Sequence, residues 1–171
     1  MFDDMPRKLS HFNVFLDAGL AFFGRCEEVT LPKITMETQD YRSGGMDAPL
    51  VIDRGLQKLE ASIVMATYEE GVMERFGMRM DGPVSLVVRG ALTVKSVSTP
   101  MSVAMRGTIT ELDFGTWKGG EDTNLTFSMV CSYYRVDMNE ITKIEIDIPN
   151  MVRNIGGIDQ LATTRAAILK A

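Results

Sequence analysis

The chain has 171 residues, and its 18 Lys plus Arg against 23 Asp plus Glu give a formal net charge of −5. This acidic balance, without a basic tract, argues against a protein that reads nucleic-acid sequence, and no apolar run reaches the roughly 18 residues that a membrane-spanning helix needs. With 45% apolar residues, we expect one soluble domain over residues 1–171. The acidic start, Met1-Phe2-Asp3-Asp4, also lacks the positive charge of a secretory signal.

Apolar and polar residues alternate with a period of two through most of the chain, which is typical of strands with one buried face. Residues 12–18 and 21–26 flank Gly19 and predict a first hairpin, and residues 29–38 predict an extended segment broken at Pro32. Later alternating runs predict strands over residues 59–65, 84–94, 125–136 and 144–148. The run 125–136 has apolar residues on both faces, so we expect that strand to be covered on both sides.

A further strand is predicted over residues 101–114, but its pattern changes phase. Met105 and Ile109 are odd-numbered, whereas Leu112 and Phe114 are even-numbered. Because a slip of one residue turns every following side chain to the opposite face, we expect a bulge or bend near Gly107.

A short internal helix is predicted around Val72. Glu69 and Glu70 precede it, where negative charge favours a helix start, and Gly77 closes it.

The carboxyl end predicts an amphipathic helix over about residues 157–170, because apolar residues recur there at helical spacing. A helix this short is marginal by itself in water. Its apolar stripe, with Ile158, Leu161 and Ile168, must therefore pack on the chain's own sheet or on a neighbour.

Two glycine-rich segments predict long loops. Residues 40–49 are too long for a tight turn and hold Tyr41, Arg42 and Met46, residue types that are enriched in interface cores. We expect a protruding loop there, with a plain solvated connection as the alternative. The second loop, residues 115–122, holds Trp117, which we expect to cap a core.

The chain offers little catalytic or metal-binding chemistry. His11 is the single histidine. The sequence therefore gives no basis for a Ser-His or Cys-His catalytic pair or for a histidine-rich metal site. Cys26 and Cys131 lie far apart without paired spacing, which favours two buried thiols. No phosphate-binding loop or dinucleotide-binding glycine pattern occurs, and we expect no enzyme, no cofactor and no metal.

Short segments from about Met5 to about Leu169 carry a resemblance to one family. They are Met5-Pro6-Arg7-Lys8-Leu9, Asn13-Val14-Phe15-Leu16, Val29-Thr30-Leu31-Pro32-Lys33, Tyr41-Arg42, Gly44-Gly45-Met46, Met105-Arg106-Gly107, Glu111-Leu112-Asp113 with Gly115 and Lys118, Gly120-Glu121, Tyr133-Tyr134, Ile146-Asp147, Asn150 and Asn154-Ile155-Gly156-Gly157-Ile158-Asp159-Gln160-Leu161. By their order and spacing, the chain resembles the major tail tube proteins of contractile-tailed bacteriophages and of R-type tailocins. One departure is Thr110, where the family often carries a basic residue.

This resemblance implies a mainly β subunit, a β-sandwich or half-barrel with one short internal helix and a carboxyl-terminal helix. It implies a structural role in the virion tail, in which six copies form a ring and the rings stack into a hollow tube. The implied partners are further copies of the chain, the tail sheath protein, the tail terminator and baseplate or initiator proteins. In a phage, genomic DNA would pass transiently through the lumen, and no stable membrane insertion is implied.

The resemblance assigns interface residues rather than catalytic ones. The implied ring-stacking loop comprises Tyr41, Arg42, Gly44, Gly45, Met46 and Asp47. The implied amino-terminal arm, about residues 1–11, makes contacts through Pro6, Arg7, Lys8 and Leu9. The implied carboxyl-terminal interface comprises Ile158, Asp159, Leu161 and Arg165.

Charge offers a check on the conduit idea. Six chains of charge −5 carry −30 per ring, and a wall of that sign repels phosphates within a Debye length of about 8 Å. Acids on polar strand faces are candidates for the lining, with ordinary solvated positions as the alternative for each; they are Glu60, Glu111, Asp113, Glu145 and Asp147. The alternative function is a monomeric β-sandwich binding module, which predicts an aromatic-rich patch and no polymers.

Overall fold

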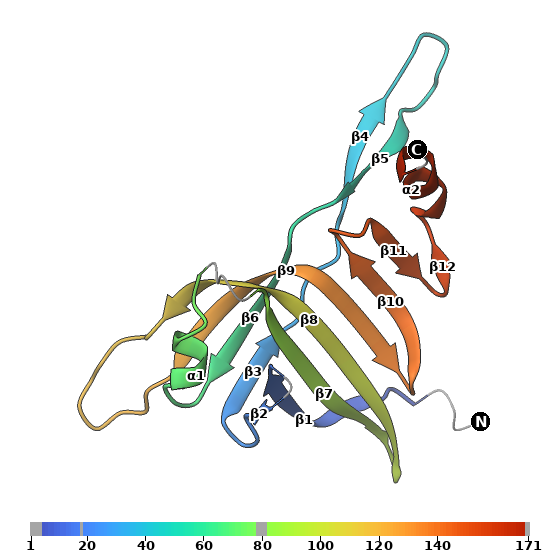
Figure 1. Ribbon diagram of the computed structural model, residues 1–171. Coiled ribbons are helices and arrows are strands. Elements are labelled where there is room, and N and C mark those ends of the chain that lie inside the picture. Colours follow the sequence, from blue (N-terminus) through green and yellow to red (C-terminus); the bar gives the residue numbers. More distant parts are fainter. Residues whose placement is uncertain (1–4, 18, 78–81, 170–171) are drawn as a thin grey trace.

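The computed structural model describes residues 5–17, 19–77 and 82–169, and strands dominate it (Figure 1). In chain order the elements are β1 (Lys8–Leu16), β2 (Leu20–Ala21), β3 (Cys26–Thr30), β4 (Met36–Tyr41), β5 (Leu50–Leu56), β6 (Leu59–Met65), α1 (Glu70–Met73), β7 (Val84–Val94), β8 (Val97–Asp113), β9 (Leu125–Met138), β10 (Ile141–Asp147), β11 (Val152–Ile155), β12 (Ile158–Asp159) and α2 (Ala162–Leu169).

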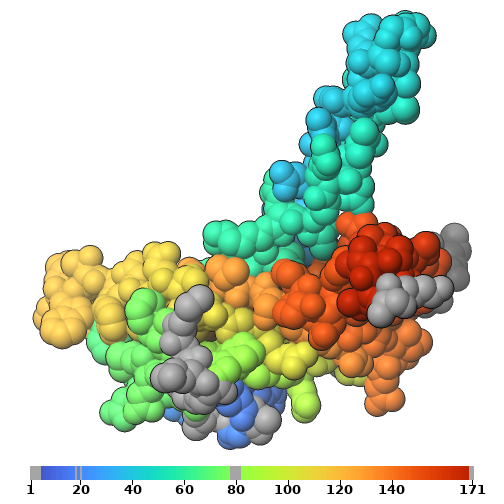
Figure 2. Space-filling model, turned by 45° about the horizontal axis from the view of Figure 1, so that its top comes forward, coloured from blue at the N-terminus to red at the C-terminus, as the bar shows by residue number. Residues whose placement is uncertain are grey.

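Within the described residues, ten strands form one antiparallel sheet with the path β12-β11-β10-β9-β8-β7-β1-β2. β9 is the branch point of this sheet, because its first half pairs with β6 and its second half pairs with β10. β3 then pairs with β6. The remaining strands, β4 and β5, form a separate two-stranded hairpin that projects from the body (Figures 1 and 2).

One hydrophobic core lies on a single face of the large sheet. Buried side chains alternate along β6, β7, β8 and β9, and β1 adds Val14 and Leu16 to the same cluster. β1 and β6 thus share a core although they lie far apart along the sheet, so the sheet curls around it. The predicted half-barrel is confirmed. The predicted strands 59–65 and 84–94 begin and end at the same residues as β6 and β7.

The predicted first hairpin is confirmed only at its turn, where Phe15 pairs with Ala21. The expected second strand, residues 21–26, is wrong. Phe22 buries its ring and still donates its N–H to the carbonyl of Val14 in β1 at 2.8 Å, and the chain then leaves the sheet edge in a turn, with Gly24 at φ 72°, that leads into β3. Residue 18 lies outside the described residues.

Thr110 is an extra residue in β8, because the register passes over it between Ile109 and Glu111. It carries the phase change, so Ile109 and Leu112 both contact the core. A register shift also occurs at Gly107, as predicted, but the extra residue there belongs to the neighbouring strand β9.

Ser132 is that extra residue in β9. Buried side chains are odd-numbered up to Cys131, and Tyr134 and Val136 are buried after it. Tyr134 and Val136, which suggested a second covered face, therefore lie on the core side, whereas Val130 lies on the opposite face, across from Glu60. The expectation that this strand is covered on both sides is wrong, and its opposite face remains partly exposed.

The carboxyl-terminal helix is shorter than predicted. Gly156 and Gly157 have positive φ angles and turn the chain back, so Ile158 pairs with Ile155 as part of β12. The helix α2 begins only at Ala162, and position 170 of the prediction lies outside the described residues. No side chain of α2 is buried, so its apolar stripe is not covered by the chain's own sheet.

Candidate assembly interface

The described residues contain no cluster of three or more potential metal ligands, and none of their helices is long and apolar enough to cross a membrane. His11 is exposed on β1. Burial raises the pKa of the Cys26 thiol to about 11 and that of Cys131 to about 12, which makes both poor nucleophiles. The surface features that remain are the hairpin, the two chain ends and the face of the sheet opposite the core.

The β4–β5 hairpin has one apolar face that no described residue covers. Its register places Tyr41 opposite Leu50 and Gln39 opposite Ile52, so these side chains share a face. Tyr41, Leu50 and Ile52 are 51%, 56% and 42% exposed. Three exposed apolar side chains on one face of a projecting ribbon are typical of a protein interface.

Arg42 organises the loop at the hairpin tip. Its guanidinium donates to the carbonyls of Met46 and Asp47 at 3.4 and 3.3 Å, and Gly45 supplies a positive φ of 90°. The six residues that the resemblance assigns to ring stacking therefore lie together at the tip, although Tyr41 is the last residue of β4 rather than part of the loop. The protruding segment is a hairpin with a folded tip, longer than the predicted loop.

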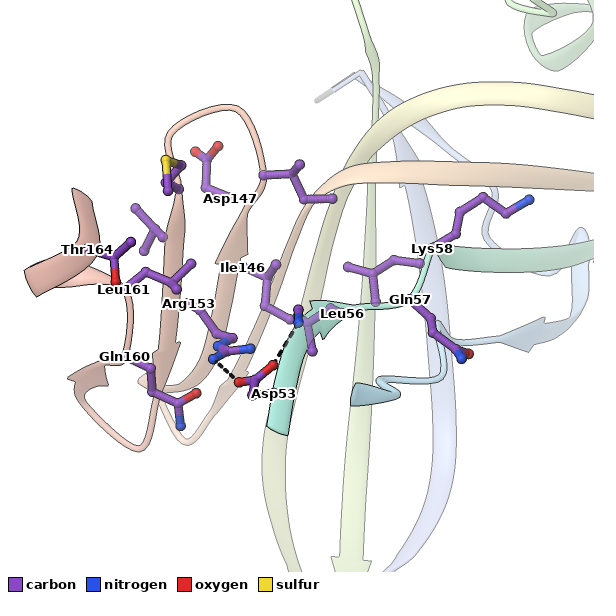
Figure 3. A pocket seen from close by; sticks show the side chains of 15 residues that line it. Asp53, Leu56, Gln57, Lys58, Ile146, Asp147, Arg153, Gln160, Leu161 and Thr164 are labelled. Carbon is purple, nitrogen blue, oxygen red and sulfur yellow. Dashed lines mark hydrogen bonds and ion pairs between the residues drawn. The ribbon is translucent and has the colours of Figure 1, made fainter. Parts of the chain in front are cut away.

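The base of the hairpin is tied to β11. Asp53 accepts a hydrogen bond from Arg153 at 2.6 Å and one from the N–H of Gly55 at 2.7 Å (Figure 3). These donors hold the pKa of the Asp53 carboxyl below its ordinary value. Beside this pair lies a groove of about 490 Å³ between the hairpin base, β10, β11 and α2, lined in part by Leu56 and Leu161.

The residues assigned to the amino-terminal arm fall into two groups. Pro6 and Arg7 precede the sheet and are exposed, whereas Lys8 and Leu9 belong to β1 and pair with β7. The arm is thus shorter than the expected 1–11, and residues 1–4 lie outside the described part of the chain. Arg7 borders a hollow of about 220 Å³ at the end of the β7–β8 ribbon, the opposite end of the molecule from the hairpin (Figure 1).

The carboxyl-terminal residues are brought together around Asp159. Its carboxylate accepts hydrogen bonds from Arg165 at 2.7 Å and from the N–H of Leu161 at 3.1 Å. The hydrogen bond from Arg165 is the main cause that holds the pKa of Asp159 below its ordinary value. Arg165 also donates to the carbonyl of Met151 at 2.8 Å. Ile158 is set apart from this network and is 71% exposed.

The five candidate lumen acids share one face. We call the side of the sheet opposite the core the outer face. The register places Glu60 opposite Val130, Glu111 opposite Ser128, Asp113 opposite Thr126, Glu145 opposite Arg135 and Asp147 opposite Tyr133. None of these ten side chains is buried, and buried residues alternate with them along each strand.

The outer face also carries bases. Arg106 lies over the ring of Tyr133 at 4.2 Å, and Arg135 pairs with Asp137 at 2.8 Å. Partial burial, together with a hydrogen bond to Glu145, raises the pKa of the Tyr133 hydroxyl. The face is therefore an organised polar surface of mixed sign rather than a uniformly acidic one.

Trp117 does not cap a core, contrary to the prediction. Its indole is 76% exposed, and its N–H donates to the hydroxyl of Tyr68 at 2.6 Å. That hydroxyl donates in turn to the carbonyl of Phe114 at 2.8 Å. Sequence reasoning missed both this aromatic cluster and the Asp53–Arg153 pair, because each joins residues far apart in the chain without a local pattern.

Comparison with known proteins agrees with these features. The family model described as phage tail tube protein FII matches residues 6–168. The chain is 35% identical to the tail tube protein of Escherichia phage P2 over 170 residues, covering 96% of this chain and 98% of that protein. It is 36% identical to the major tail tube protein of Serratia phage KSP20 over 150 residues, covering 86% of each.

Solved structures show the same fold at low identity. The tube-terminating cap of the anti-feeding prophage matches with a TM-score of 0.62 at 12% identity, over 78% of this chain and 92% of that chain. A chain from the sheath–tube complex of an extracellular contractile injection system matches with a TM-score of 0.57 at 13% identity, over 80% and 93%. The chain therefore belongs to the phage tail tube protein FII family, a family of structural proteins of the virion tail.

Proposed function

We propose that this tail tube protein forms hexameric rings that stack into a hollow tube, with the β4–β5 hairpin reaching the adjacent ring. The observation that carries the proposal is the uncovered apolar face of Tyr41, Leu50 and Ile52 on a ribbon that projects beyond the body (Figure 2). Exposed apolar area of this kind is stabilised by burial at about 25 cal/mol per Å². Repetition of the same chain along an axis would bury it in every ring but one.

The outer face is proposed as the lining of the lumen. This face carries charges of both signs but is rich in carboxylates, so phosphate groups would slide past it. With this face toward the channel, the core side of the sheet is turned away from the channel. A reconstruction of assembled tubes by electron cryomicroscopy tests this orientation. Glu60, Glu111 and Glu145 should face the channel, and an outward position for this face would overturn the assignment.

The proposed partners follow from the same tube. The sheath protein, a terminator and baseplate or initiator proteins would contact its outside and its two ends, and genomic DNA would pass through the lumen in a phage. A contractile system that carries no DNA would use the same subunit as a puncturing tube.

Removal of the hairpin tip tests ring stacking. Deletion of Arg42–Asp47 leaves Tyr41 and Leu50 to be joined by Ala48-Pro49, so the ribbon can still close. We expect a normally folded chain by circular dichroism that forms single rings or subunits, but no long tubes, in negative-stain images. Normal tubes from this variant would overturn the stacking role.

Substitution on the two faces of the hairpin gives a matched pair. Leu50→Thr with Ile52→Thr removes two of the three apolar side chains of this face and places β-branched threonine, which suits a strand, at both positions. Val51→Thr makes the same kind of change on the opposite face, where Val51 is 65% exposed. The double variant should fail to form tubes and the control should form them. Wild-type protein that stays monomeric when concentrated would favour the binding-module alternative.

A further inference from the structure

Trp117 is held in one place while its ring remains open to solvent. The Tyr68 hydroxyl fixes the indole N–H, and the Tyr68 ring meets the Phe114 ring edge-on at 5.8 Å between centroids. The loop start is pinned as well, because the N–H of Gly115 donates to Asp113 at 2.9 Å. An exposed tryptophan that is already positioned loses little conformational freedom on binding, which is a property of interface hot spots.

The opposite side of the molecule offers an apolar groove. Loop 114–124 lies at one side in both views, and β10, β11 and α2 lie at the other (Figures 1 and 2). The groove at the hairpin base has a volume of about 490 Å³ and is lined by Leu56, Ile146, Ile148 and Leu161 (Figure 3). This volume falls in the range of sites that enclose a small organic group, roughly 300–1,000 Å³.

The groove also presents a guanidinium, that of Arg153. Arg153 lines it and is 12% exposed, and its Nε atom is buried without a hydrogen-bond partner in the described structure. The guanidinium already pairs with Asp53, and its Nε–H is a further donor that no acceptor among the described residues meets. The Trp117 loop carries carboxylates at Glu121 and Asp122, which are acceptors of the right charge for a guanidinium.

We propose that Trp117 of one subunit inserts into the Leu56–Leu161 groove of the next subunit within a ring, with an acidic residue of its loop bonding Arg153. The inference rests on the proposed function for the presence of neighbouring copies. The contact joins two different surfaces of the same chain, and an interface of that kind generates a closed ring when its rotation closes. The occupant of the groove is therefore a second copy of this chain.

Trp117 is the only tryptophan in the chain, so its fluorescence reports the contact directly. In dilute wild-type protein its emission should be that of a solvated indole, readily quenched by iodide. Under assembling conditions, with rings or tubes confirmed by electron microscopy, the emission should shift to shorter wavelength and iodide quenching should fall severalfold. Assemblies in which Trp117 remains fully quenchable would overturn this inference while leaving the proposed function intact. Absence of any assembly would overturn both.

Two variants on α2 test the groove itself. Thr164→Arg places a large charged side chain on the groove rim, whereas Thr163→Arg makes the same change one residue earlier, at an exposed position that does not line the groove. The first should raise the concentration needed for assembly by about tenfold or more, as expected for loss of a hot-spot contact, and the second should not. Equal protection of Trp117 in assemblies of both variants would show that the indole docks elsewhere.

Discussion

The carboxylate of Asp53 lies 2.6 Å from the guanidinium of Arg153, 100 residues later in the chain. This contact ties the base of the projecting hairpin to β11, next to the groove that we assign to a neighbouring subunit. The angle of the hairpin and the shape of the groove therefore depend on the same ion pair.

Acid should loosen the hairpin. Because Arg153 and the Gly55 N–H lower the pKa of Asp53 in the folded state, the attachment is fully present above the ordinary value of 3.8 and is lost as pH falls through the lowered pKa. Hydrogen exchange of residues 36–56 should accelerate in acid beyond its intrinsic pH dependence. Asp53→Asn should show the faster exchange already at neutral pH, and an unchanged rate would mean that the pair does not hold the hairpin.

Core truncation should destabilise the subunit itself. Leu86 is fully buried, and Leu86→Ala should lower the free energy of unfolding by about 2–5 kcal/mol through lost burial and a residual cavity. Phe127→Ala, also fully buried, should cost about 3–5 kcal/mol. Urea unfolding of the dilute chain measures both. Leu169→Ala is the matched control at a 71% exposed position, and its effect should stay within about 0.5 kcal/mol.

Gly107 should not tolerate any side chain. A Cβ atom added there would lie 1.9 Å from the carbonyl oxygen of Val130 in β9, so the two strands would have to separate. We expect Gly107→Ala to cost about 3 kcal/mol or more in urea unfolding. Gly119→Ala has open space around its Cβ position, and it should leave stability nearly unchanged. Equal stability of the two variants would show that the close strand approach is misplaced.

Thiol labelling should be slow in the folded chain. The pKa of Cys26 is about 11 against an ordinary 9.0, so at pH 8 its thiolate fraction is lower on the order of a hundredfold. Burial raises the pKa of Cys131 further, to about 12. Ellman's reagent should therefore react with Cys26→Ser protein more slowly than with Cys131→Ser protein, and urea should abolish the difference. Rapid labelling of both native thiols would contradict the burial.

Alternation predicted strands well where one face is buried throughout. Residues 84–94 became β7 without change, because Val84, Leu86 and Val88 all point into one core. Pattern reading failed where backbone geometry intervenes. Ser132 inserts an extra residue that a polar-apolar count cannot distinguish from a second apolar face.

The end of the chain shows a similar limit. Ile158 to Leu169 has helical spacing, but Gly156 and Gly157 first form a turn that returns Ile158 to the sheet edge. A tertiary pairing thus overrides a local pattern, and only the part after Leu161 becomes helix.

The candidate site was predictable as a set of surfaces but not as contacts. The sequence indicated a protruding segment near Tyr41 and a set of acids on polar strand faces, and the register places those acids on one face. It held no signal that Arg153 would meet Asp53, or that Tyr68 would hold Trp117 outward, because these contacts depend on how distant segments pack.

The extra residues Thr110 and Ser132 bear on how this chain can change length over evolution. Insertion or deletion of a single residue next to either one would reverse inside and outside for the rest of a long strand. The tips at 42–49 and 114–124 face no such constraint, so homologues should differ in size at those tips and keep a constant spacing within each strand, from Met105 to Leu112 in β8 and from Met129 to Val136 in β9.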